Sequence, residues 1–163
     1  MLDRVIEFLS RQRYAVVSTV GAFGAPESAL VGIAWWRPLA GLPELMFDTI
    51  SSSRKAKNIA RDPRCSLVLG WEDETTIQLE GDGRRVEGTE LQRAKLDYFD
   101  IWPQCRAHES WSDVAYFSIR PRWLRYSCYL GEAVIREFDE QQLVSGLPDH
   151  GVGLFSRSRA PKR

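Results

Sequence analysis

The sequence predicts a mainly β fold of the α+β class, in which about six to seven antiparallel strands close into a barrel with flanking helices. Short runs of β-branched and aromatic residues recur along the chain, separated by turns that contain Gly or Pro. A few segments instead repeat apolar residues at helical spacing. The length of 163 residues is natural for one domain with a substantial core.

The predicted strands begin at residue 14. Residues 14–20 are rich in β-branched side chains, and the turn 21–26 follows them. Residues 27–36 form a second strand that is almost uniformly apolar, so both of its faces could be covered, one by the barrel and one by a cofactor or a partner subunit. The other predicted strands are 44–49, 65–69, the kinked segment 76–87, and three more between residues 114 and 138.

The predicted helices flank these strands. Residues 2–12 are amphipathic and open the chain. Thr89 is expected to be the N-cap of a helix, with Gln92 completing a capping box, and residues 104–111 are expected to form a second short helix. Residues 1–138 therefore make up the predicted barrel domain. Residues 139–163 are a predicted appendage, partly disordered, with a short helix near 140–144 and a basic end.

The stretch from Phe47 to Trp71 is the most informative part of the chain. A strand ends near Thr49, and Ser52 or Ser53 is a good N-cap for the helix that follows. Arg54 and Lys55 then lie in the first helical turn, where the helix dipole already places positive charge. Cations and free N–H groups at a helix start favour an anion, and phosphate is the usual one. The alternative is that Arg54, Lys55 and Lys57 are only a solvated helix face.

This stretch resembles the central motif of the pyridoxamine 5'-phosphate oxidase-like family, in its general-stress-protein-like branch. The similar residues are Phe47-Asp-Thr, Ser53-Arg-Lys, Asp62-Pro-Arg-Cys-Ser-Leu and Trp71, and the likeness extends more loosely over residues 5–138. The resemblance implies an FMN-binding split β-barrel that forms a homodimer with two cofactor sites at its interface. It also implies that Thr49, Ser53, Arg54 and Lys55 hold the FMN phosphate, and that Phe47 belongs to the same site.

The resemblance further implies where the flavin ring would lie. Backbone groups near Val31 and Gly32 would contact the ring, and Gly32 leaves room for a flat group. A glutamine on the strand 76–87 of the neighbouring subunit would bond the ring edge. Two ways of counting place that position at Thr76 or at Gln78, so both are candidates. The alternatives are an ordinary core strand with a bulge at Gly32 and an exposed polar residue at Gln78.

Two departures from the family concern the cofactor site. Ala29 and Ala34 stand where the oxidases of this family carry an Arg and a Lys that bind FMN. Their loss argues against pyridoxamine-phosphate oxidation as the reaction, and implies either a lower cofactor affinity or replacement by another cation such as Arg37. Asp48 is expected to point away from the phosphate, because Phe47 and Thr49 share the other face of the strand.

Composition limits the class of protein. Lys plus Arg and Asp plus Glu balance at 22 each, so no overall charge favours nucleic acid or a membrane surface. The three cysteines are widely spaced and only His108 and His150 accompany them, which predicts no metal site and no disulfide framework. The first residues are amphipathic, include acidic side chains and lack the apolar core of a signal peptide. These features together predict a cytoplasmic protein.

The predicted function is an FMN-dependent oxidoreductase that acts on an unidentified small substrate. No side chain stands out as an acid or base, so no catalytic residue is assigned. Two alternatives are a deazaflavin-dependent reductase and a non-catalytic flavin- or heme-binding stress or sensor protein.

Overall fold

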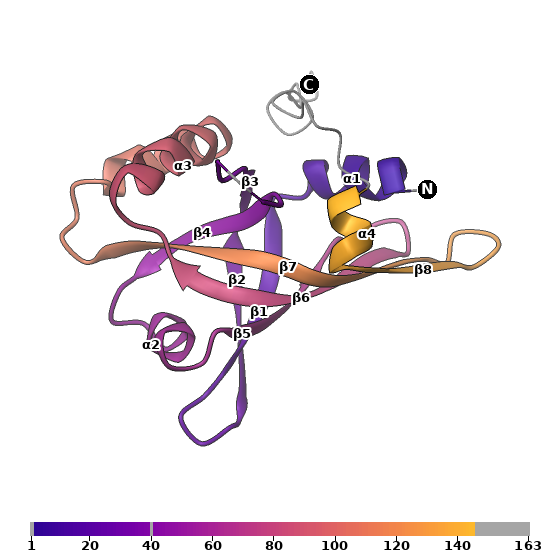
Figure 1. Ribbon diagram of the computed structural model, residues 1–163, viewed down its shortest axis with the longest axis horizontal. Coiled ribbons are helices and arrows are strands. Elements are labelled where there is room, and N and C mark those ends of the chain that lie inside the picture. The colour runs from indigo at the N-terminus through magenta and orange to yellow at the C-terminus, as the bar shows by residue number, and fades with distance from the viewer. Residues whose placement is uncertain (1, 40, 146–163) are drawn as a thin grey trace.

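The computed structural model describes residues 2–39 and 41–145, which form a curled antiparallel sheet with flanking helices. Figure 1 shows α1 (Leu2–Arg11) beside α4 (Glu140–Ser145) at one end of the curled sheet, α2 (Arg54–Arg61) at the other end, and α3 (Gly88–Ile101) over the outer face. The sheet curls only part of the way to a closed barrel. This arrangement confirms the predicted split β-barrel of the α+β class.

Eight strands in the described ranges make up the sheet, and every pairing between them is antiparallel. Their order along the sheet is β2 (Pro26–Gly32), β1 (Tyr14–Val20), β5 (Arg64–Leu69), β6 (Thr75–Arg85), β7 (Val114–Cys128), β4 (Glu44–Ile50) and β3 (Ala34–Trp36). The last strand, β8 (Val134–Asp139), pairs with the free half of β7.

The predicted strand 27–36 is wrong as a single strand. It divides at Ile33 into β2, which pairs with β1, and β3, which pairs with β4. Ile33 is fully buried, and its N–H donates to the Arg13 carbonyl at 2.9 Å, so the chain changes partners without losing a hydrogen bond. This change of partners lets the curled sheet bring its two ends together.

The predicted strands 114–121 and 123–129 are in fact one long strand, β7. Pro121 cannot donate a ladder hydrogen bond, and the β6–β7 register shifts opposite it, between Glu80 and Gly81. A Cβ at Gly81 would overlap the Arg120 carbonyl oxygen, so only glycine permits this approach of the two strands. The register shift therefore accommodates the missing N–H of Pro121, and β7 continues past it.

The helices follow the predicted amphipathic segments, with one wrong detail. Ser53 is the N-cap of α2, as predicted, and its Oγ accepts the Ala56 N–H at 3.3 Å. The predicted capping box at Thr89 is absent, because α3 begins at Gly88 and its N-cap, Glu87, makes no side-chain cap bond. The predicted helix 104–111 is the 3-10 helix η1 (Pro103–His108). None of the described helices is long and apolar enough to cross a bilayer.

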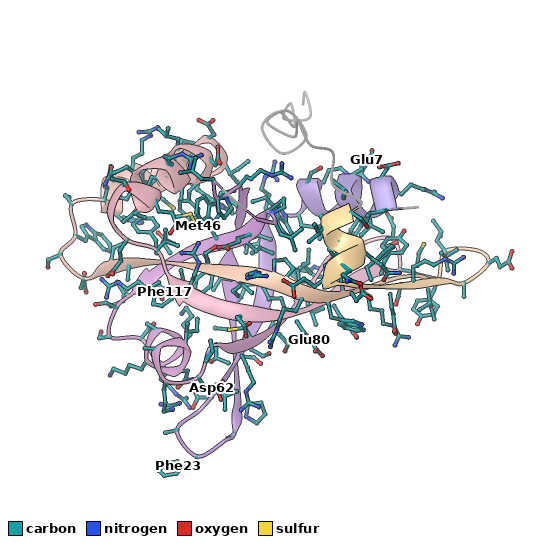
Figure 2. The ribbon with its side chains drawn as sticks, viewed as in Figure 1. Glu7, Phe23, Met46, Asp62, Glu80 and Phe117 are labelled. Carbon is teal, nitrogen blue, oxygen red and sulfur yellow. The ribbon has the colours of Figure 1, made fainter. Side chains whose placement is uncertain are left out.

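Apolar side chains gather in two cores on the two faces of the sheet. The first fills the barrel and includes Phe47, Leu79 and, from α4, Leu143. The second lies between α3 and the outer face of β3, β4 and β7, and includes Met46 on the side that α3 covers (Figure 2). Residues 140–145 thus pack on the barrel, while 146–163 lie outside the described residues, so the predicted domain division stays a prediction.

Candidate cofactor site

The start of α2 brings two predicted hydroxyl groups together. Thr49 lies near the end of β4, and its Oγ1 donates to the Ser53 Oγ at 3.3 Å. Ser53 has an extended backbone with φ −63° and ψ 156°, as an N-cap requires. The N–H groups of Arg54 and Lys55 make no hydrogen bond to any residue in the described ranges. They lie at the positive end of the helix dipole and are free to bind an anion.

The two cations in this turn differ in their surroundings. Arg54 has a side chain that is 80% exposed, and it forms an ion pair with Glu27 of β2. Lys55 is half-buried and makes no ion pair with a described residue. Of the two, Lys55 is therefore the cation whose charge is not already neutralised within the chain.

Glu27 places a carboxylate beside the predicted phosphate site. Its Oε2 accepts a hydrogen bond from Asn58 Nδ2 at 2.8 Å, and the same amide donates to Thr19 Oγ1 at 3.0 Å. Hydrogen bonds from Arg54 and Asn58 lower the pKa of Glu27 from 4.5, so the carboxylate is ionised at neutral pH. A Cβ at Gly21 would lie 2.7 Å from Oε1, so this glycine leaves room for the carboxylate.

Sequence reasoning missed Glu27 and Asn58. The available signals were that Glu27 is the one charged residue of β2 and that Asn58 lies on the buried side of α2. Neither signal identifies the other residue as its partner, because 31 positions separate them.

The predicted ring residues of β2 lie in more crowded surroundings than expected. The Val31 side chain is buried in the barrel core, so only its backbone could meet a ligand. A Cβ at Gly32 would lie 3.0 Å from Cζ2 of Trp102, and Trp102 Nε1 donates to the Ile33 carbonyl at 2.9 Å. The flat group that packs against Gly32 in this chain is therefore the Trp102 indole, which the sequence did not indicate.

Thr76 and Gln78 lie on the outward face of β6, as strand alternation predicts. Thr76 is half-buried and Gln78 is exposed, and neither side chain hydrogen-bonds a described residue. Gln78 stands between Val68 of β5 and Arg125 of β7 in the sheet register. Because β1 and β5 separate β6 from β2, one chain does not bring these residues to the β2 positions.

Three other positions named from the family resemblance have distinct surroundings. The Phe47 side chain is fully buried and stacks on Phe117 with ring centroids 5.8 Å apart, so only its backbone could contact a cofactor. Ala29 is half-buried on β2, on the same face as Glu27. Ala34 is 3% exposed in the core beneath α3, which leaves no space there for a lysine side chain.

Asp48 points away from the predicted anion site, as expected from strand alternation. It lies on the opposite face of β4 from Phe47, and its Oδ1 accepts a 2.8 Å hydrogen bond from Tyr98 Oη of α3. Its charge is therefore on the far side of the sheet from a phosphate at Ser53.

A separate apolar cavity lies beneath α1 and α4, away from α2. Its walls include Leu9, Trp35, Leu124 and Leu143 and contain no charged side chain. A phosphate would find no counterion there, so this cavity does not compete with the α2 start as an anion site.

Solved structures share this fold at low sequence identity. A heme binding protein from Mycobacterium smegmatis has a TM-score of 0.70 at 19% identity over 86% of this chain. A protein from Clostridium acetobutylicum related to general stress protein 26 has a TM-score of 0.64 at 16% identity, and the match covers 87% of this chain and 96% of that one. A pyridoxamine 5'-phosphate oxidase-related, FMN binding protein from Nostoc punctiforme has a TM-score of 0.59 at 16% identity, and the match covers 80% of this chain and 84% of that one.

Some of these relatives are much longer. The chain spans 58% of the heme binding protein and 55% of an Agrobacterium tumefaciens protein of unknown function. No curated protein sequence matches the chain. The family model for pyridoxamine 5'-phosphate oxidase, however, matches residues 1–128, which is most of the sequence. The chain therefore belongs to the pyridoxamine 5'-phosphate oxidase family.

Proposed function

We propose that this protein is a homodimeric, cytoplasmic flavoprotein that binds FMN and acts as an oxidoreductase on a small substrate. The observation that carries the proposal is the anion site at the start of α2. The hydroxyls of Thr49 and Ser53 lie there, together with the N–H groups of Arg54 and Lys55, to which no described residue hydrogen-bonds. Lys55 is the second residue of the helix and makes no ion pair with a described residue. The FMN binding relative from Nostoc punctiforme supports the choice of flavin. The free thiols of Cys65, Cys105 and Cys128 support a reducing compartment.

The residues at this site fit a phosphate group. The N–H groups of Arg54 and Lys55 would donate to its oxygens, Lys55 would neutralise its charge, and Ser53 would set the start of the helix that presents these donors. Bound FMN would supply the redox chemistry. The chain would bind and orient the cofactor, with the backbone of Val31 and Gly32 toward the ring and Thr76 or Gln78 of the second subunit at the ring edge.

The experiment that tests the function is a titration of the purified protein with FMN, followed by flavin fluorescence and the visible spectrum. We expect quenching and a shifted spectrum that saturate at about one FMN per chain. Reduction of the bound flavin by NADH or NADPH would then support an enzyme over a binding protein. Absence of any spectral change would contradict the FMN proposal.

Two alternative ligands are tested in the same way. A relative described as heme binding has a TM-score of 0.70, and Glu27 places an acid beside the phosphate site, which opposes FMN. Heme uptake would give an intense Soret absorption band. A deazaflavin-dependent reductase would bind and reduce a deazaflavin and would not bind FMN. Either result, in the absence of FMN binding, would replace the FMN proposal.

Replacement of Glu27 with Gln is expected to strengthen FMN binding roughly tenfold. The change removes a negative charge beside the predicted phosphate position and releases Arg54, and one screened charge–charge interaction of this kind changes a dissociation constant roughly tenfold. Gln keeps the Asn58 contact available. The affinity for riboflavin, which lacks the phosphate, should not change. An equal rise in the affinities for FMN and riboflavin would show that Glu27 does not act on the phosphate.

The proposed homodimer would use the outward face of the sheet. One row across this face runs from Leu30 through Val16 and Val68 to Gln78 in the strand register. Leu30 is 63% exposed and Val68 is 41% exposed, and exposed apolar residues grouped in this way mark protein interfaces. A second copy seated here would cover these side chains and would lie beside Gln78.

Substitution of Leu30 with Asp is therefore expected to convert the dimer to a monomer, because a charge would be buried without a partner. Light scattering after size-exclusion chromatography measures the mass. Leu96→Asp is the matched control, since Leu96 on α3 is also 63% exposed and lies outside the row. A dimer that survives Leu30→Asp as well as Leu96→Asp would place the interface elsewhere.

A further inference from the structure

Three potential metal ligands meet where η1 packs against β4. Asp48 comes from the strand, while Cys105 and His108 come from η1, three positions apart. One ligand atom from each lies within 4.8 Å of the others, and all three residues are half-buried. The cluster is on the face of the sheet opposite Phe47 and Thr49, so it is distinct from the anion site.

The carboxylate of this cluster is already oriented by a neighbour. Tyr98 is 1% exposed, and its hydroxyl donates to Asp48 Oδ1 at 2.8 Å. The other carboxylate oxygen makes no hydrogen bond to a described residue. Ligands of protein-bound metals are commonly held in this way by a second hydrogen-bonding group.

A buried hydroxyl without a partner points to the same place. Tyr116 pairs with Asp48 across the β4–β7 ladder, so both side chains are on the η1 side of the sheet. The Tyr116 hydroxyl is buried and no described residue hydrogen-bonds it. Burial and the nearby Asp48, Glu109 and Cys105 raise the pKa of Tyr116 to about 12, so the hydroxyl keeps its proton. Such a group normally has a partner, and a metal-bound water is one that fits.

We propose that Asp48, Cys105 and His108 bind one Zn²⁺ ion, whose fourth position is open to a water molecule beside the Tyr116 hydroxyl. An oxygen, a sulfur and a nitrogen ligand together suit zinc, and three protein ligands with one open position is a common zinc arrangement.

The charges around the cluster permit a divalent cation. The Asp48 carboxylate and a Cys105 thiolate would balance the charge of Zn²⁺. Two cations lie nearby. Lys95 has its Nζ 5.0 Å from the Tyr116 ring centroid, and its charge is neutralised by Glu109 at 2.9 Å. Arg106 is exposed, and its guanidinium lies over the Phe99 ring, 4.8 Å from the centroid. Zinc binds cysteine as the thiolate, so binding of the ion would release the thiol proton of Cys105.

The ion would attach η1 to β4 and so would also hold the segment that carries Trp102. Trp102 directly precedes η1 and packs against Gly32. The metal would therefore set the position of the indole at β2, without being part of the anion site.

The test is a titration of the full-length, chelator-treated protein with Zn²⁺ by calorimetry and with Co²⁺ as an optical probe. We expect one ion per chain and a thiolate-to-cobalt charge-transfer band. Cys105→Ser should weaken binding at least ~100-fold and remove the band, because the thiolate is a direct ligand. Tyr98→Phe, which removes only the orienting hydroxyl, should weaken Zn²⁺ binding ~10–100-fold. Cys128→Ser is the matched control, since Cys128 is also half-buried but lies outside the cluster.

Failure of the wild-type protein to bind Zn²⁺ or Co²⁺ would overturn the proposal, whether or not any variant folds. Binding that Cys105→Ser leaves unchanged, or that Cys128→Ser removes, would overturn it as well. As a second measurement, Zn²⁺ should protect Cys105, and not Cys128, from alkylation by iodoacetamide when the modified peptides are mapped by mass spectrometry.

Discussion

Replacing both Arg54 and Lys55 with alanine should weaken FMN binding at least ~100-fold. Hydrogen bonds that involve a charged group contribute about 1.5–3 kcal/mol each, and the double substitution removes two cations from the start of α2. Lys55→Ala alone should account for most of the loss, because Arg54 is partly neutralised by Glu27. Flavin fluorescence titration measures the dissociation constant of each variant.

The matched control is Lys57→Ala. Lys57 lies on the same helix and is exposed, and its N–H already donates to the Ser53 carbonyl, so this N–H is not available to the predicted phosphate. Its loss should change FMN affinity by less than about threefold, as expected for a screened surface charge. If the double variant and Lys57→Ala bind FMN equally well, the phosphate is not held at the start of α2.

Replacing Arg84 with Met should lower the free energy of unfolding by about 3 kcal/mol. Arg84 donates to the Glu44 carboxylate at 2.9 Å, and Glu44 is only 6% exposed. A buried carboxylate that loses its cation is destabilising by about 3–5 kcal/mol. The lower end applies here because Ser118 Oγ still donates to Glu44 at 2.5 Å. Urea unfolding followed by tryptophan fluorescence measures the change.

Two further variants separate the buried charge from the loss of a surface ion pair. Arg84→Met combined with Glu44→Gln should recover part of the stability, because no unpaired charge then remains in the interior. Arg85→Met, which removes an exposed pair with Glu87 at 3.0 Å, should change the free energy by less than ~1 kcal/mol. An Arg84→Met variant as stable as Arg85→Met would show that Glu44 does not depend on this ion pair.

Local patterns predicted much of the secondary structure. The strand at residues 14–20, the strand before α2 and the helix with its Ser53 cap follow from β-branched runs, helical periodicity and N-cap chemistry. The errors lie where a distant segment decides the outcome. Whether 27–36 stays one strand depends on which strands pair with each half, and whether Pro121 ends a strand depends on Gly81 across the ladder.

The error at the predicted helix start, Thr89, has a more local cause. A capping box is a local pattern, yet the fold uses the neighbouring Glu90 for two hydrogen bonds with Arg84, at 2.7 and 2.8 Å, and begins the helix at Gly88. An ion pair with Arg84, near the end of the preceding strand β6, thus competed with the local cap.

By itself, the sequence determined the fold class and the grouping of Thr49, Ser53, Arg54 and Lys55 that predicts an anion site, because these residues are close along the chain and one strand-to-helix junction brings them together. Only the tertiary structure decided what else lies near these groups. Glu27 reaches Arg54 across 27 positions, Trp102 reaches Ile33 across 69, and Asp48 meets Cys105 and His108 from separate elements. Strand pairing and helix packing create such contacts, and neither leaves a local pattern in the sequence from which a partner can be identified.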